Sequence, residues 1–222
     1  MSRVDLILLS MRRWVDEMTR SVDRPRALSH TGFQGSKRMT ITDVRTDLVL
    51  VHSTQAATIH APIGSVNIAD WVLNLPDAEY QRCAPPDHLA AGSTTTDDGR
   101  PMSINVEEIG GALVVQHYVA ELHEPHHCHL VSMSDLRTPL GWSKIQVIWD
   151  LSVSAEDGGT CRFTNLVISY PTHGFLDMLE AAGQTFEHAA AALQEAVADH
   201  NRRETLLFAD SIERHAAATS AS

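Results

Sequence analysis

The second half of the chain alternates apolar and polar positions in short segments that are separated by turn residues. The separating stretches are DDGRP, GG, HEPH, RTPLG and AEDGG, which are typical of hairpin turns. No helical segment comes between them, so consecutive strands pair as antiparallel neighbours. We predict strands at 89–96, 103–109, 112–123, 127–135, 142–153 and 160–170.

The clearest alternation lies in residues 143–153. One side of this strand carries Lys144, Gln146, Ile148, Asp150 and Ser152. The other side carries Ser143, Ile145, Val147, Trp149, Leu151 and Val153. This pattern predicts a sheet with one buried face and one mostly exposed face.

Other periodic segments flank the hairpins. Residues 48–61 are rich in Val, Ile and Thr, which favours a first strand. Residues 68–88 predict one or two short helices, broken at Pro76. A long helix is expected from about residue 173, with Thr172 as its N-cap. A second helical piece follows Arg203.

The start of the chain is set apart from this pattern. Residues 5–21 have a helical apolar stripe, and residues 22–38 are a polar linker with Pro and Gly. We therefore divide the chain into an N-terminal helix and linker (1–38), one domain (39–216) and a frayed tail (217–222). The first segment is either an appendage or the result of a start site upstream of Met39.

Composition excludes several function classes. Seventeen basic against 28 acidic residues give a net charge of −11, which repels nucleic-acid phosphates. The three cysteines contain no CxxC pair, so we expect no disulfide framework and a cytoplasmic location. No apolar run reaches the roughly 20 residues that span a bilayer. A homodimer is left open.

The order of strand, short helices, six hairpin strands and C-terminal helix resembles the START/Bet v 1-like (SRPBCC, helix-grip) superfamily. Two stretches carry the resemblance: ATIHAPIGSVNIADWVLNLPDAEY, and VIWDLSVSAEDGG with the segment that follows it. The ending HNRRETLLFADSIERHA is similar to a poorly characterised branch. The resemblance implies an α+β fold, in which a curved antiparallel sheet of about seven strands wraps a long helix around an apolar cavity.

The family includes polyketide cyclases, dehydratases and lipid carriers. The resemblance therefore implies binding of a small apolar or aromatic molecule, with cyclisation or dehydration by acid/base positioning and no cofactor as one outcome. A non-catalytic carrier or a partner-binding module is the alternative. An enzyme would place titratable groups inside the cavity, whereas a carrier would line it almost wholly with apolar groups.

Candidate site residues follow from the strand faces and the short helices. His117 and Glu121 share one face of strand 112–123, and with the Tyr80 hydroxyl they form a candidate acid/base set. The alternative is that this face is exposed to water. Candidate ligand contacts are Trp71, Trp149, Phe163 and Asn165, for which core packing or structural hydrogen bonds are the alternatives.

The stretch HEPHHCH holds four histidines in seven residues. His123, His127 and His129 could converge on a metal ion if the loop is tight, which would make a metal-dependent enzyme. No HExxH or CxxC motif supports this arrangement. We therefore favour a solvated hairpin turn or a role at the mouth of the cavity, and no metal site.

Overall fold

The computed structural model describes residues 43–220. The helix and linker predicted over residues 1–38 lie outside the described residues. Those that are described belong to one compact unit, Met39–Ser222.

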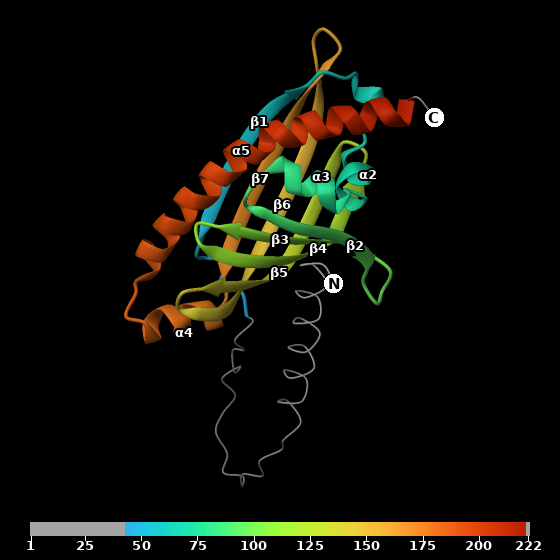
Figure 1. Cartoon of the computed structure of the whole chain (residues 1–222). Helices are drawn as coiled ribbons and strands as arrows, with labels where there is room; N and C mark the ends of the chain where they lie inside the picture. Colours follow the sequence, from blue (N-terminus) through green and yellow to red (C-terminus); the bar gives the residue numbers. More distant parts are fainter. Residues whose placement is uncertain (1–42, 221–222) are drawn as a thin grey trace. The chain divides into compact units, whose positions relative to one another are not determined.

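Seven antiparallel strands form a single sheet (Figure 1). They run in the order β1-β7-β6-β5-β4-β3-β2, so all neighbours except β1 and β7 are joined by hairpins. The strands are β1 (Val51–Ile59), β2 (His88–Thr95), β3 (Pro101–Ile109), β4 (Ala112–Glu124), β5 (His127–Thr138), β6 (Gly141–Glu156) and β7 (Thr160–Pro171). The predicted hairpins and the α+β class are confirmed.

The helices lie on one side of this sheet. The long helix α5 (Phe186–Ser220) crosses its inner face diagonally (Figure 1). The short helices α2 (Ile68–Leu73) and α3 (Asp77–Cys83), with the 3-10 turn η1 (Ile63–Ser65), lie beside the C-terminal half of α5. α2 ends at Leu73 and α3 begins directly after Pro76, so the break between the two helices falls where the sequence predicts it, because proline cannot continue a helix.

The C-terminal helix differs from the prediction in where it breaks. The chain forms α4 (His173–Ala181) first, and Thr172 caps it by accepting the Phe175 N–H at 3.2 Å. Gly183 then takes a left-handed φ of +67°, a conformation that ends helices. The following helix α5 runs unbroken from residue 186 to 220, through the point where two pieces were predicted and into the predicted frayed tail.

The predicted alternation of β6 is confirmed. Ile145, Val147, Trp149, Leu151 and Val153 are buried on the inner face. Their apolar side chains face α5 and form the core, so the sheet and the helix are held together mainly by burial of apolar surface.

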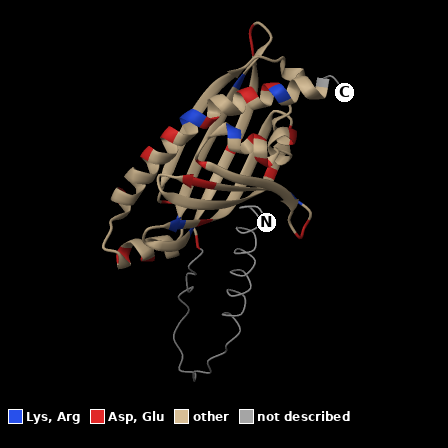
Figure 2. Ribbon diagram, in the orientation of Figure 1, with Lys and Arg blue, Asp and Glu red and all other residues tan. Residues whose placement is uncertain are grey.

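Charged side chains of both signs follow one another along α5 (Figure 2). Asp199 pairs with both Arg202 and Arg203 at helical spacing, and Arg214 pairs with Glu79 of α3. Such exposed pairs add little stability each.

The turn between β3 and β4 touches α5 at Gly110. This glycine has a φ of +58°, and a Cβ atom added to it would lie 2.7 Å from the Cβ atom of Ala196. We expect Gly110→Ala to lower the free energy of unfolding by about 2–4 kcal/mol, from left-handed strain and overpacking together. Urea denaturation of the full-length protein measures this change.

The neighbouring Gly111 is the matched control. Its φ is +79°, but nothing lies within 4 Å of the position that a Cβ atom would occupy, so Gly111→Ala should cost only the strain of about 1–2 kcal/mol. Adding Ala196→Gly to Gly110→Ala should relieve the contact, so the double variant should lose less stability than its two single variants together. Equal losses for Gly110→Ala and Gly111→Ala would show that the turn does not press on α5.

Candidate functional site

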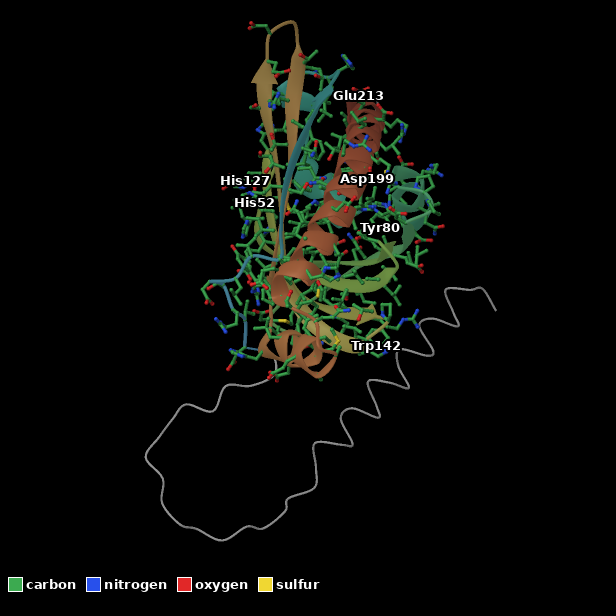
Figure 3. The ribbon with its side chains drawn as sticks, turned by 90° about the vertical axis from the view of Figure 1, so that its left-hand side faces the viewer. His52, Tyr80, His127, Trp142, Asp199 and Glu213 are labelled. Carbon is green, nitrogen blue, oxygen red and sulfur yellow. The ribbon has the colours of Figure 1, made fainter. Side chains whose placement is uncertain are left out.

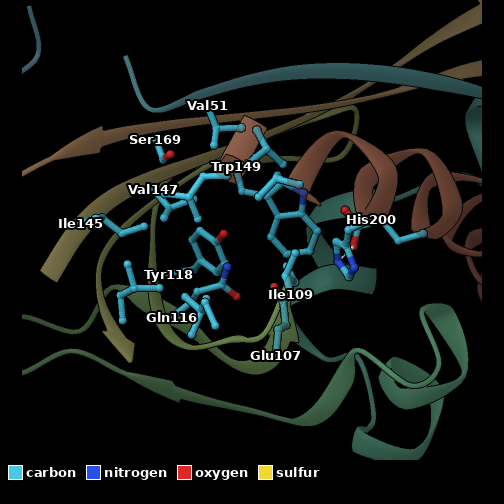
Figure 4. Close-up of a pocket in the computed structure, with 17 residues that line it drawn as sticks. Val51, Glu107, Ile109, Gln116, Tyr118, Ile145, Val147, Trp149, Ser169 and His200 are labelled. Carbon is cyan, nitrogen blue, oxygen red and sulfur yellow. Dashed lines mark ion pairs between the residues drawn. The ribbon is translucent and has the colours of Figure 1, made fainter. Parts of the chain in front are cut away.

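A cavity lies between the inner face of the sheet and α5 (Figure 4). The space that the centre of a water molecule can reach is about 60 Å³. Since one water needs roughly 10–15 Å³ of such space, the cavity can hold several waters or a small organic molecule. Most of its wall is apolar and includes Ile109, Val114, Val147, Trp149, Leu193 and Val197.

One end of this cavity is charged. Glu107 of β3 and both His200 and Glu204 of α5 are among the residues that line it. Figure 4 shows His200 reaching in from α5, opposite the Tyr118 and Gln116 side chains of β4. Charged groups are rarely buried unless they are paired or functional, so this end of the cavity is the candidate site.

Glu204 is at the centre of a buried cluster of ionisable groups. Its Oε2 atom lies 3.3 Å from Nε2 of His88 and 3.2 Å from Nε2 of His200. His88 Nε2 is also 3.8 Å from Oε1 of Glu107. Despite these short distances, neither Nε2 atom has a hydrogen-bond partner among the described residues.

The opposite ring nitrogens of the two histidines are both held. His88 Nδ1 donates to the backbone carbonyl of Tyr80 at 2.7 Å. His200 Nδ1 donates to Oδ2 of Asp87 at 2.9 Å, and Arg203 donates to the same oxygen. A carbonyl or carboxylate oxygen can only accept, so Nδ1 carries the hydrogen in both rings and fixes their orientation.

Tyr80 closes the cluster from α3. Its ring is stacked on that of His88, with centroids 3.8 Å apart and planes 1° from parallel. Its hydroxyl donates to Oε1 of Glu107. The tyrosine therefore ties the short helix, β2 and β3 to the charged end of the cavity.

Asn165 connects this cluster to the apolar wall. Its Oδ1 accepts the indole N–H of Trp149 at 2.8 Å, and its amide donates to Glu204 Oε1 and Thr205 Oγ1, both at 3.1 Å. All of these groups are buried. The carboxylate of Glu204 thus accepts from an amide at Oε1 and faces the two imidazoles at Oε2.

Burial and charge act against each other on these groups. Burial alone lowers the pKa of His200, but the charges of Glu204 and Glu107 and the hydrogen bond with Asp87 outweigh it, and the pKa lies above its ordinary value. Burial raises the pKa of Glu204, but the two imidazoles outweigh it and hold the pKa below the ordinary range. Burial, with Glu107 beside it, raises the pKa of Tyr80 well above the usual value.

Comparison with solved structures gives the fold. The chain is similar to the Zhui aromatase/cyclase from Streptomyces sp. R1128, with a TM-score of 0.50, 14% identity, and coverage of 76% of this chain and 94% of that one. It is also similar to the di-domain ARO/CYC StfQ from the steffimycin biosynthetic pathway, with a TM-score of 0.51 and 12% identity. That match covers 80% of this chain and 54% of StfQ.

The chain has the START/Bet v 1-like helix-grip fold. No protein-family model matches the chain, and no curated protein matches its sequence. None of the helices in residues 43–220 is long and apolar enough to cross a membrane.

The helix-grip arrangement puts His117 and Glu121 on the face of β4 that points away from the cavity. The cavity is lined from β4 by Val114, Gln116 and Tyr118, which alternate with them along the strand. Glu121 is exposed and pairs with Arg100 at 2.7 Å. Burial lowers the pKa of His117, which is only partly covered. The structure therefore brings neither residue to Tyr80.

The four predicted ligand contacts are placed in three different environments. Trp149 lines the cavity, and Asn165 lies behind it, bonded to it. Phe163 is fully buried in the core, outside the cavity wall. Trp71 donates its indole N–H to Ser211 at 3.1 Å and lies at a separate groove between α2, α3 and α5.

The HEPHHCH stretch forms the β4–β5 hairpin, whose turn contacts η1 and the start of α2 through His126 and Pro125. His127 lies on the face of the sheet away from Tyr80 and α5 (Figure 3). His127 Nε2 lies 3.1 Å from Asp150, and His129 Nδ1 lies 2.6 Å from the same carboxylate. His123 is exposed and is not part of this group. The stretch thus forms two imidazole–carboxylate pairs at the partly exposed outer face, and not the three converging imidazoles that a metal site there would need.

The cysteines offer no activated nucleophile. All three thiols are free and buried. Burial raises the pKa of Cys83 and of Cys128 to about 12, and it raises that of Cys161 as well. Because the thiolate is the reactive form, these groups are poor nucleophiles at neutral pH.

Sequence reasoning missed His88, Glu107, His200 and Glu204. One signal was present on α5, where the apolar stripe through Leu193 and Val197 continues through positions 200, 204 and 208. The histidine and the glutamate therefore occupy inward-facing positions of an amphipathic helix. Polar residues at such positions need a partner in the core.

Proposed function

We propose that the protein binds a small, mainly apolar aromatic molecule in the cavity and catalyses proton transfer on it. The class of reaction is a cyclisation or dehydration without covalent attachment to the protein. The solved structures of similar fold include two aromatase/cyclases, which supports this class through fold alone.

The observation that carries the proposal is the charged end of an otherwise apolar cavity. A carrier of apolar molecules needs only apolar walls, and burying Glu107, His200 and Glu204 beside the ligand would weaken its binding. An acid/base enzyme needs titratable groups where the ligand reacts. The cavity combines apolar walls with titratable groups at one end, as an acid/base enzyme requires.

The ligand would contribute an apolar ring and at least one polar group. Trp149 and Tyr118, whose ring centroids are 5.3 Å apart, offer aromatic surface to the ring. The amide oxygen of Gln116 is buried without a hydrogen-bond partner among the described residues, and it can accept from a hydroxyl group of the ligand. The size of the cavity favours a small ligand over a large polycyclic one.

Glu107 is the general base in this proposal. Tyr80 donates to its Oε1 and thereby orients the carboxylate, which leaves Oε2 for a proton of the ligand. The neighbouring His200 provides positive charge at the same end of the cavity, where a developing enolate oxygen would be stabilised. Tyr80 then acts as a positioning residue, while His117 and Glu121 have no role in the reaction.

The binding step is tested with 2-naphthol, measured by isothermal titration calorimetry on the full-length protein. Val114 lines the cavity, so Val114→Phe should fill part of it and weaken binding at least about tenfold, or about 1.4 kcal/mol. The stability of the variant is checked by urea denaturation.

Val119→Phe is the matched control, because Val119 lies on the same strand but on the opposite face. This variant should bind 2-naphthol like the original protein. The proposal of a ligand-binding cavity is overturned if both variants bind equally well, or if the original protein binds none of a panel of one- and two-ring phenols and ketones.

A further inference from the structure

We propose that His88, His200 and Glu204 bind a divalent transition-metal ion of the zinc class. Among the described residues, these three form the one group of histidine, cysteine and carboxylate side chains whose ligand atoms all lie within 4.8 Å of one another. The inference does not rest on the proposed function, because ion binding is measured without a substrate. It departs from the expectation that the protein has no cofactor.

The two imidazoles are oriented as metal ligands are. The Nδ1–H of His88 donates to the backbone carbonyl of Tyr80, and the Nδ1–H of His200 donates to the carboxylate of Asp87. In the neutral rings this leaves the lone pair on Nε2. Metal-bound histidines almost always donate their other ring N–H to a carboxylate or carbonyl group in this way.

Both Nε2 atoms also point at one place without making a hydrogen bond. They lie 3.3 and 3.2 Å from the same oxygen of Glu204, and both are buried without a partner among residues 43–220. The His88 side chain is fully covered and that of His200 is 4% exposed. A buried polar atom without a partner is costly, and a shared ion would satisfy both nitrogens and the carboxylate at once.

Charge balance favours the same conclusion. With neutral imidazoles, Glu204 and the adjacent Glu107 place two negative charges in the interior, and Asp87 is already compensated by Arg203. A divalent cation cancels both charges. Two imidazoles and a carboxylate suit zinc, iron or nickel better than magnesium or calcium, which prefer oxygen ligands.

The arrangement leaves a position open toward the cavity. His200 and Glu204 line the cavity, while His88 approaches from the other side, from the start of β2. Catalytic metal sites typically have three protein ligands and keep a further position for water or substrate. A bound ion would supply a Lewis acid at the charged end of the cavity, in place of the positive charge of a protonated His200.

The test uses the full-length protein after dialysis against a chelator. Zn²⁺ is titrated by calorimetry, and Co²⁺ is titrated with visible absorption as the readout. We expect one ion per chain and an absorption spectrum of four- or five-coordinate cobalt. Glu204→Gln keeps the shape of the side chain and its bond to Asn165, and it should weaken binding about 100-fold or more. Asp87→Asn weakens the contacts with the His200 ring and with Arg203 but removes no metal ligand, and it should weaken binding about 10–100-fold.

The matched control is His127→Ala/His129→Ala, which removes the imidazole pair on the outer face. It should bind like the original protein, because that pair alternates with the buried residues of β5 and lies on the outer face, whereas Glu204 lines the cavity on the inner face. The proposal is overturned if the dialysed protein binds no ion stoichiometrically. It is also overturned if the control abolishes binding while Glu204→Gln and Asp87→Asn, both checked for folding by circular dichroism, do not change it.

Discussion

Replacing His200 with leucine is expected to lower the free energy of unfolding by about 3–5 kcal/mol in buffer that contains a chelator. His200 is buried between Glu204 and Asp87, and its side chain is 4% exposed. Without it, the carboxylate of Glu204 stays in the interior beside Glu107 with a single imidazole, that of His88, nearby. Urea denaturation followed by circular dichroism measures the loss.

The double variant His200→Leu/Glu204→Leu separates charge from packing. It removes the unpaired carboxylate together with its partner, and buried ion pairs can often be replaced by apolar residues at little cost. We expect it to regain most of the stability that the single variant loses. At the surface pair, Arg100→Leu should change stability by no more than about 0.5 kcal/mol. If the double variant were less stable than His200→Leu alone, the electrostatic explanation would be wrong.

The strands could be predicted because their signals are local. Alternation over eleven residues assigns the inner face of β6, and glycine-rich turns fix where each hairpin reverses. The break between α4 and α5 was missed for the opposite reason. The apolar stripe continues across Gly183 in sequence, and only the left-handed φ of that residue separates the two helices.

The candidate site could not be predicted in the same way, because its parts come from distant segments. His88 opens β2, Glu107 is near the end of β3, and His200 and Glu204 are one turn apart on α5. No spacing in the sequence relates β2 to α5, and only the packing of the helix across the sheet brings them together. Tyr80 was chosen for its hydroxyl, but its partner Glu107 was not.

The two histidine groups show why density along the chain is a poor guide to a site. HEPHHCH places four histidines in seven residues, yet successive side chains of a strand point to opposite faces and its members separate. His88 and His200 are 112 positions apart, but their ring centroids are 5.2 Å apart. In an antiparallel sheet that packs on a helix, ligands converge across the layer more readily than along a strand.

The ligand proposal and the metal proposal share one end of the cavity but fail independently. Val114 lies on the apolar wall, so its substitution affects the ligand and leaves the Nε2 atoms of His88 and His200 unchanged. Asp87→Asn disturbs the orientation of His200 and leaves the apolar wall intact. If the protein binds 2-naphthol but no metal ion, the metal proposal is wrong and the ligand proposal stands. If it binds the metal ion but none of the aromatic ligands, the ligand proposal is wrong and the metal proposal stands.

Replacing Glu107 with glutamine is expected to slow proton abstraction from a bound ketone by about 10²–10⁴-fold, the usual contribution of a positioned general base. Glutamine keeps the size of the side chain and can still accept the Tyr80 hydroxyl, so the loss would come from basicity and not from folding. The measurement is deuterium uptake at C1 of 2-tetralone in D₂O, followed by proton NMR with the full-length protein and compared with buffer alone.

Glu108 provides the control, because it is the next residue of β3 and its side chain is exposed. Glu108→Gln removes the same charge from the same strand, and it should exchange the ketone proton as fast as the original protein. Repeating both measurements with added chelator and with added Zn²⁺ shows whether an ion at Glu204 contributes to the rate. Equal rates for the two glutamine variants would remove Glu107 from the reaction and leave the cavity with a binding role alone.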